Sequence, residues 1–248
     1  METVRAGELV GTVGDGGPFA VLWVHGFGSH RGGEKAEAVR AECGRRGWGF
    51  AAFDFRGHGD SPGAMADLTA TRLLEDLDAV WSHLQGRGIT RLGLVGSSMG
   101  GFAAAWFARR HPERVAGCVF VAPAFQFLER RWTAVTDAER AEWRRTGRRP
   151  FKSEWVACEL GYGLIAERER FTLLDLADGW HHPTLIFHGC GDDTVPIRDS
   201  LDFLRLVPPG DVEVRLIRDG DHRLTAYKDR IAAGVGELFA RTGGERGA

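Results

Sequence analysis

A serine between two glycines is the first residue whose type and setting indicate chemistry. Ser98 is the centre of Gly-Ser-Ser-Met-Gly at 96–100, which fits the pattern G-x-S-x-G. A predicted strand at 91–95 precedes it and a predicted helix at 100–110 follows, which is the setting of a nucleophile on a tight turn. The glycines leave room for such a turn, and the helix N-terminus favours a developing negative charge. We expect Ser98 to be the nucleophile and the neighbouring Ser97 to serve only the turn.

A serine nucleophile needs a base, and the base needs an acid that orients it. His222 follows the last predicted strand, 212–217, in a Gly-Asp-His sequence, and we expect it to be the base. The acid is expected in the loop after the preceding strand, where Asp192 and Asp193 are adjacent. Spacing to the Val-Pro pair that follows favours Asp192, with Asp193 as the alternative. Asp221 is a poor orienter because neighbouring side chains diverge, so it is expected to hydrogen-bond within its loop.

The oxyanion that forms during acyl transfer needs two hydrogen-bond donors. One is expected to be the backbone N–H of Met99, directly after the nucleophile. The other is expected in the loop after strand 19–24, where Phe27 N–H is the candidate. Gly26 and Gly28 flank it and would let the backbone approach a substrate closely. His25 is expected to structure this loop rather than to act as a catalyst.

Apolar stretches of strand length alternate with helical patterns along most of the chain. The predicted strands are 19–24, 49–55, 91–95, 115–122, 184–188 and 212–217. The predicted helices are 34–46, 71–84, 100–110 and 224–241. This alternation is typical of βαβ units, so the fold class is α/β with a mostly parallel sheet. Ligands bind beyond the carboxyl ends of the strands in such sheets, where the candidate residues are expected to meet.

One long segment, 125–180, interrupts this alternation. It is rich in Trp, Arg and Glu, is helical in places, and is broken at Gly147 and Pro150. We expect a hydrolase-type core formed by 1–124 and 181–248, with 125–180 as a helical cap over the sheet edge. A structural excursion without a substrate role is the alternative. The arginines of the segment are expected to form a solvated helix face, with attraction of acidic substrates as the alternative. These arginines are Arg130, Arg131, Arg144, Arg145, Arg148 and Arg149.

Composition excludes several classes of protein. The chain has 248 residues, a net charge of -2 and a pI of about 6.5, so no nucleic-acid partner is expected. It contains no apolar run near the roughly 18 residues of a membrane span and no signal-peptide pattern at its start. The four scattered cysteines form no C-x-x-C pair, which favours reduced thiols and a cytoplasmic location. The adjacent His181 and His182 lack a third ligand, and we expect neither a metal nor an organic cofactor.

The motifs occur in the order seen in the α/β-hydrolase superfamily, which the chain resembles over nearly its whole length. The matching stretches are 25–28, 54–61, 96–100, 188–196 and 220–222. Within the superfamily the chain is similar to capped serine esterases and thioesterases, in particular to the group containing acyl-glucuronide esterase and palmitoyl-protein thioesterase. The resemblance implies an eight-stranded type of sheet. Residues 4–12 supply at most one or two short strands, so a reduced sheet is the alternative.

These features together predict a carboxylic ester hydrolase that works through an acyl-enzyme. Hydrolysis of thioesters, or another acyl transfer on the same three residues, is the alternative. A non-catalytic ligand-binding protein on this scaffold is an alternative of another class, but such proteins typically lack one of the three residues. The expected partner is a small ester or thioester, with no membrane involved, and the sequence specifies no oligomeric state.

Overall fold

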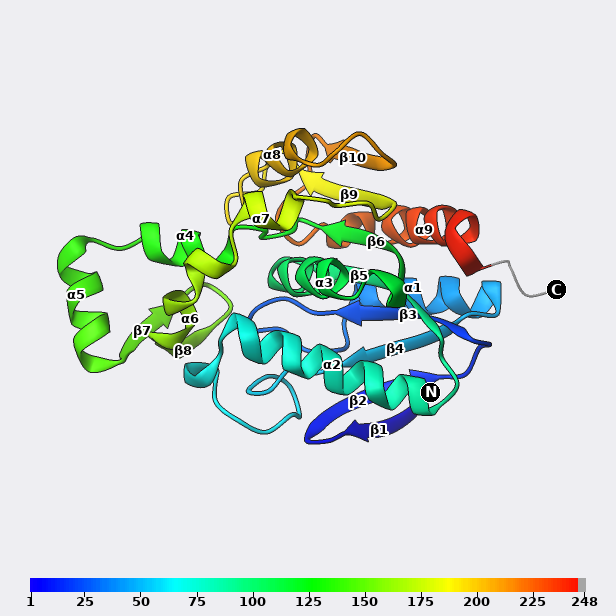
Figure 1. Ribbon diagram of the computed structural model, residues 1–248, viewed down its shortest axis with the longest axis horizontal. Coiled ribbons are helices and arrows are strands. Elements are labelled where there is room, and N and C mark those ends of the chain that lie inside the picture. Colours follow the sequence, from blue (N-terminus) through cyan, green and yellow to red (C-terminus); the bar gives the residue numbers. More distant parts are fainter. Residues whose placement is uncertain (245–248) are drawn as a thin grey trace.

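Eight strands form one sheet in the computed structural model, which describes residues 1–244. Their spatial order is β1-β2-β4-β3-β5-β6-β9-β10 (Figure 1). The bounds are β1 Glu2–Ala6, β2 Leu9–Gly14, β3 Phe19–Val24, β4 Gly49–Phe53, β5 Arg91–Ser97, β6 Val115–Val121, β9 Thr184–Gly189 and β10 Val212–Ile217. The β1–β2 and β2–β4 pairs are antiparallel, and every other pair is parallel. The N-terminal residues therefore supply two strands, and the sheet is not reduced.

Helices cover both faces of this sheet. The strands β3, β4, β6 and β9 are buried along their whole length, as their unbroken apolar sequences predict for a parallel sheet covered on both sides. One apolar cluster joins the sheet to α1 (Glu34–Arg46) and α9 (Lys228–Phe239). The other joins it to α2 (Ala70–Gly86), α3 (Met99–Arg110) and α8 (Arg198–Leu206) (Figure 1).

The last helix begins later than the sequence pattern predicts. Leu224 has a φ of 49°, in the left-handed region, and a single 3-10 turn, η4 (Thr225–Tyr227), follows it. The α-helix α9 starts only at Lys228. The predicted helix 224–241 is therefore wrong at its start, because the backbone turns sharply after the His222 loop. The final four residues of the predicted 181–248 segment lie outside the described residues.

The segment between β6 and β9 lies beyond the carboxyl ends of the parallel strands (Figure 1). It contains α4 (Phe127–Thr133), α5 (Asp137–Thr146), α6 (Gly163–Ala166), the 3-10 turn η3 (Arg168–Arg170) and α7 (Leu173–Ala177). It is not helical throughout, because β7 (Arg148–Lys152) and β8 (Ala157–Gly161) form an antiparallel hairpin. Trp143 of α5 is buried and donates from Nε1 to the carbonyl oxygen of Leu160 in β8, at 3.0 Å.

Polar contacts tie this segment to the rest of the chain. The carboxylate of Glu167 accepts hydrogen bonds from the backbone N–H of Thr71, at 2.9 Å, and from the Thr71 hydroxyl. Thr71 lies in the first turn of α2, where the helix dipole favours a negative charge. Gly161 packs so closely that a Cβ there would lie 2.1 Å from the carbonyl oxygen of Ala66. The segment is therefore anchored to the start of α2 and the turn before it.

None of the helices within residues 1–244 combines the length and the apolar character that crossing a membrane requires.

Candidate active site

Ser98 lies on the turn between β5 and α3 with an unusual backbone. Its φ and ψ are 54° and -119°, a conformation that costs free energy in a residue with a side chain. Gly96 and Gly100 make the turn possible. A Cβ at Gly96 would lie 2.6 Å from the carbonyl oxygen of Gly100, and one at Gly100 would lie 2.1 Å from that of Val24. The predicted steric reason for the two glycines therefore applies in this structure.

The structure brings Ser98, His222 and Asp192 into one hydrogen-bonded chain. His222 Nε2 lies 3.1 Å from Ser98 Oγ, and His222 Nδ1 lies 2.8 Å from Asp192 Oδ2. A carboxylate can only accept, so Nδ1 carries the ring hydrogen and Nε2 accepts from the serine hydroxyl. Each residue comes from a different loop, after β5, β9 and β10, at the carboxyl edge of the sheet.

Both carboxylate oxygens of Asp192 face hydrogen-bond donors. Its Oδ1 accepts from the N–H groups of Thr194 at 2.9 Å and Val195 at 2.8 Å. Its Oδ2 faces His222 and also His188 Nε2, at 3.2 Å. Burial alone would raise the pKa of the Asp192 carboxyl, but these hydrogen bonds outweigh it and hold that pKa well below its ordinary value. Asp192 therefore carries a negative charge beside the imidazole.

The predicted alternatives lie elsewhere in the same loops. Asp193 is exposed, and its Oδ1 accepts from the hydroxyl of Thr194 at 3.1 Å. Asp221 accepts from the N–H of Leu224 at 2.7 Å, within its own loop. Neither carboxylate is hydrogen-bonded to His222, so the structure assigns that contact to Asp192.

The loop after β3 lies directly against Ser98. A Cβ at Gly26 would be 3.3 Å from the Cβ of Ser98, which places the backbone of Gly26 and Phe27 beside the serine. Met99 is the first residue of α3, so its N–H has no acceptor within the helix. The two predicted donors, Phe27 N–H and Met99 N–H, thus belong to the two backbone segments that adjoin Ser98.

His25 holds this loop in place. Its Nδ1 donates to the carbonyl oxygen of Gly26 at 2.8 Å, and its Nε2 accepts from the N–H of Phe55 at 3.1 Å. Burial, together with the nearby His58 ring, lowers the pKa of His25 to about 3. The ring therefore stays neutral, which the accepting Nε2 requires. This is the loop-structuring position predicted for it.

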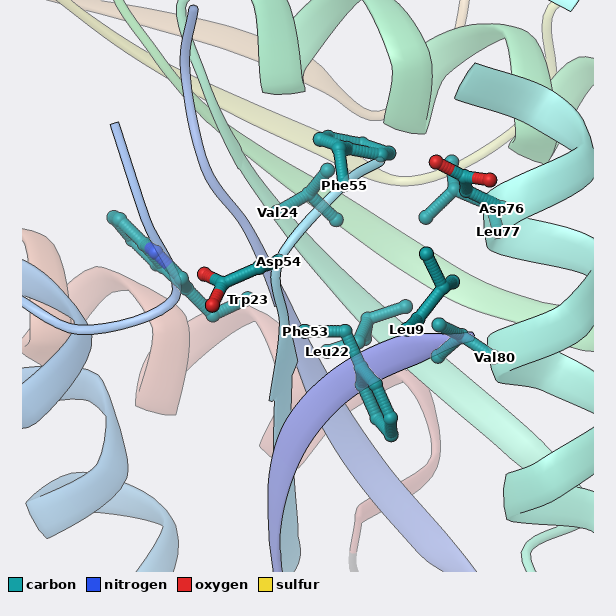
Figure 2. Close-up of a pocket in the computed structure, with 10 residues that line it drawn as sticks. All are labelled: Leu9, Leu22, Trp23, Val24, Phe53, Asp54, Phe55, Asp76, Leu77 and Val80. Carbon is teal, nitrogen blue, oxygen red and sulfur yellow. The ribbon is translucent and has the colours of Figure 1, made fainter. Parts of the chain in front are cut away.

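A cavity of about 510 Å³ opens at the serine. Its wall includes Ser98, His222, Gly26, Phe27, Gly28 and Trp155. The two glycines predicted to contact substrate therefore line it, and Trp155 comes from the tip of the β7–β8 hairpin. Figure 2 shows a second space, lined by residues of β2, β3, β4, α2 and the loop after β4. Its volume is about 10 Å³. That volume is about the size of one water molecule and cannot hold a substrate.

The paired histidines before β9 bind backbone groups. His182 Nε2 donates to the carbonyl oxygen of Ala108 at 3.1 Å, and His181 Nδ1 lies 3.0 Å from that of Gly179. Within the part of the chain that the structure describes, no three His, Cys, Asp or Glu side chains are arranged to hold a metal ion.

Two buried residues at this site carry no role in the sequence prediction. His188 Nδ1 lies 2.7 Å from the hydroxyl oxygen of Ser200, and both residues are fully buried. His188 is within the predicted motif 188–196, and its position four residues before Asp192 is the one signal for its contact. Ser200 lies in α8 and has no sequence signal, because a buried serine in a helix has many ordinary explanations.

The strand order, the two antiparallel strands at one edge and the covering helices define the α/β-hydrolase fold. The solved structure of a putative hydrolase from Agrobacterium vitis S4 superposes with a TM-score of 0.84, at 29% identity, over 96% of this chain and 97% of that one. Mouse alpha/beta hydrolase domain-containing protein 10 superposes with a TM-score of 0.83, at 27% identity, over 97% and 98% of the two chains.

Residues 19–150 match the family model described as serine aminopeptidase, S33. The chain belongs to this family of α/β hydrolases. The chain is also 30% identical, over 213 residues, to human palmitoyl-protein thioesterase ABHD10, mitochondrial. The matched region spans 84% of this chain and 68% of the human protein.

Proposed function

We propose that this hydrolase cleaves carboxylic esters through an acyl-enzyme on Ser98. The observation that carries the proposal is the chain of contacts from Ser98 Oγ to His222 Nε2, 3.1 Å, and from His222 Nδ1 to Asp192 Oδ2, 2.8 Å, at the wall of a cavity. Nucleophile, base and orienting acid are thus in hydrogen-bond reach in the order that acyl transfer requires.

The reaction would proceed in two steps. His222 accepts the proton of Ser98 as Oγ attacks the carbonyl carbon, and the N–H groups of Phe27 and Met99 stabilise the oxyanion. The carbon–oxygen bond to the leaving group breaks, and His222 donates its proton to the departing alcohol. Water then gives a proton to His222 and attacks the acyl carbon. The bond from that carbon to Ser98 Oγ breaks, His222 returns the proton to Oγ, and the acid leaves. Asp192 stays ionised throughout and stabilises the imidazolium.

The same residues support thioester hydrolysis as a second candidate. The human relative is named a palmitoyl-protein thioesterase, and its identity extends over 84% of this chain. A thiol leaves in place of the alcohol, and every other step is unchanged.

We also propose that 125–180 acts as a cap that shapes the cavity. Its hairpin contributes Glu154 and Trp155 to the cavity wall, and Trp155 is 65% exposed. The cytoplasmic location expected from the sequence stays a prediction, since the human relative is described as mitochondrial.

The test uses wild type, Ser98→Ala and Ser97→Ala on 4-nitrophenyl esters from acetate to palmitate. We expect Ser98→Ala to lose at least about a thousandfold in kcat/KM, as removal of a triad member does, whereas Ser97→Ala keeps most of it. Acyl-coenzyme A thioesters of the same chain lengths, assayed by thiol release, decide between the two candidate reactions. The higher kcat/KM identifies the preferred bond.

Labelling with a fluorophosphonate separates a wrong substrate from a wrong mechanism. Covalent modification of Ser98 without turnover of any ester or thioester would leave the nucleophile intact and move the search to amides. Folded wild type with neither turnover nor labelling would overturn the proposal in favour of a ligand-binding protein.

A further inference from the structure

Exposed leucines are confined to one region of the chain that the structure describes. They are Leu174 of α7, Leu201, Leu204 and Leu206 of α8, and Leu216 of β10. Helix α7 contacts α8, and α8 contacts β10, so the three elements are neighbours at one end of the sheet (Figure 1). Exposed apolar side chains gathered on adjacent elements are typical of a surface that another molecule covers.

The strand β10 ends the sheet beside these leucines. It pairs with β9 on one side and has no neighbouring strand on the other within residues 1–244. The N–H of Cys190 donates to the carbonyl oxygen of Ile217 at 2.8 Å, so the odd-numbered residues of β10 bond toward β9. The N–H and carbonyl groups of Val214 and Leu216 therefore point away from β9, along an open edge.

The two faces of β10 differ in character. The even-numbered side chains are apolar and share the α8 face, where two of them join an apolar cluster. They are Val212, Val214 and Leu216. Glu213 and Arg215 share the α9 face, where Arg215 Nε lies 2.7 Å from Glu213 Oε1 and Arg215 Nη1 lies 3.0 Å from Glu237 Oε2 of α9. One face of the open edge is thus apolar and the other is charged.

A second copy of β10 matches this edge when it runs antiparallel about a two-fold axis at Val214. Val214 then faces its own copy, and Leu216 faces Val212 of the second copy. Glu213 faces Arg215 of the second copy, and the symmetry repeats this pair on the other side of the axis. An axis at Glu213 or at Arg215 would instead place like charges opposite each other. Charges on an edge strand usually discourage pairing, but in the register at Val214 they attract.

We propose that the surface formed by β10 and the exposed leucines binds a second copy of this chain, in a two-fold dimer whose sheets join through β10. The axis stands perpendicular to the sheet, so both α8 helices lie on the same face of the joined sheet, on either side of the axis. Their exposed leucines add apolar area to the contact between the strands. The dimer does not depend on the proposed chemistry of Ser98.

Sedimentation equilibrium measures the association of the purified full chain. We expect wild type to reach twice the monomer mass of 27.2 kDa. The concentrations run from about 1 to 100 µM, where an interface of modest size associates. Glu213→Arg and Arg215→Glu each place like charges across the axis and should each raise the dimer Kd by about tenfold or more.

Mixing the two variants gives the sharper test. In a heterodimer of Glu213→Arg with Arg215→Glu, every cross-strand pair again joins opposite charges, so the mixture should recover a one-to-one dimer that neither variant forms alone. The matched control is Arg5→Glu, which reverses an exposed charge on β1, the strand at the opposite edge of the sheet. Its Kd should stay within about twofold of wild type, because a charge remote from the contact is screened by salt.

A wild type that stays a monomer throughout would overturn the inference, and its flotation with phosphatidylcholine vesicles would assign the leucines to a lipid surface instead. A dimer that Glu213→Arg leaves intact would also overturn it, because another surface would then hold the copies together. The same holds for a mixture that stays monomeric although both variants unfold at the temperature of wild type. If Arg215→Glu does not fold beside Glu237, the comparison of Glu213→Arg with Arg5→Glu carries the test.

Discussion

The candidate site continues beyond its three central residues. His188 Nε2 faces two acceptors, Asp192 Oδ2 at 3.2 Å and the carbonyl oxygen of Val195 at 3.0 Å, so it must carry a hydrogen. Nδ1 then accepts from the hydroxyl of Ser200. The two acceptors at Nε2 thus fix the tautomer in which His188 faces Asp192 with a donor, and the Ser200 hydroxyl donates to the other ring nitrogen. A chain of polar groups therefore runs from α8 to Ser98.

We expect His188→Leu to lower kcat by about tenfold or more, because one donor to a buried carboxylate is lost. KM should change little, since His188 does not line the cavity. His188→Gln places an amide N–H close to the position of Nε2 and should recover most of the rate. Steady-state kinetics on the best ester measures both effects. Equal losses in the two variants at equal thermal stability would contradict a role in orienting Asp192.

Residue identities could be predicted where a motif ties type to position. Ser98, Asp192 and His222 each stand at a fixed place after a strand, and the structure brings them together. His188 could not be assigned in this way. Its contact with Ser200 joins β9 to α8, and how these two elements pack is not visible in the sequence.

At the scale of elements, the β7–β8 hairpin meets the loop that follows β3. Gly28 has a φ of 66°, and a Cβ there would lie 1.9 Å from a methyl carbon of Val156. Val156 directly precedes β8. Hairpin and loop therefore fit together only because residue 28 has no side chain.

Gly28→Ala should lower both the free energy of unfolding and kcat/KM. A positive φ alone costs about 1–2 kcal/mol in a residue with a Cβ, and the clash with Val156 adds to it. Gly47→Ala is the control, because Gly47 has a φ of 69° and nothing within 4 Å of its Cβ position. Urea unfolding and ester kinetics measure the two variants, and adding Val156→Ala to Gly28→Ala should restore part of the loss. Identical behaviour of Gly28→Ala and Gly47→Ala would show that the contact is unimportant.

Elements of the sheet could be predicted closely from their apolar patterns. Strands β3 and β10 and helix α1 have the predicted bounds. The β3 sequence is an unbroken apolar run buried on both faces, β10 begins with valines alternating with charged residues, and α1 ends at Gly47 in the left-handed conformation. The hairpin in 125–180 was not predicted. Its β7 sequence, Arg-Arg-Pro-Phe-Lys, is short and charged, and its pairing with β8 depends on the turn between them.

For the whole molecule, several buried histidines make the fold sensitive to acid. Burial lowers the pKa of His182 to about 4, and burial with the neighbouring His58 lowers that of His25 to about 3. An unfolded histidine binds its proton near pH 6.5. Between these values the unfolded chain binds more protons than the folded one, so stability falls as the pH falls.

We expect the free energy of unfolding to be highest above pH 6.5 and to fall steadily toward pH 4. Each histidine contributes a slope of up to about 1.4 kcal/mol per pH unit within its window. His182→Gln keeps a donor for Ala108 but cannot titrate, so its stability should fall less steeply between pH 6.5 and 4. Urea unfolding at several pH values measures the slopes. Parallel curves for wild type and His182→Gln would contradict the assignment.

The point at which segment 125–180 leaves the sheet and returns to it bears on how this protein can evolve. Ser98, Asp192 and His222 follow β5, β9 and β10, whereas 125–180 leaves after β6 and returns before β9 as one uninterrupted stretch. Under the proposed function, insertions, deletions or exchanges within that stretch would alter which molecules reach Ser98 and would leave the three residues in place. After a gene duplication, one copy could therefore acquire a new substrate range through changes in one contiguous stretch of its coding sequence. Its reaction and the residues proposed to carry it would stay the same.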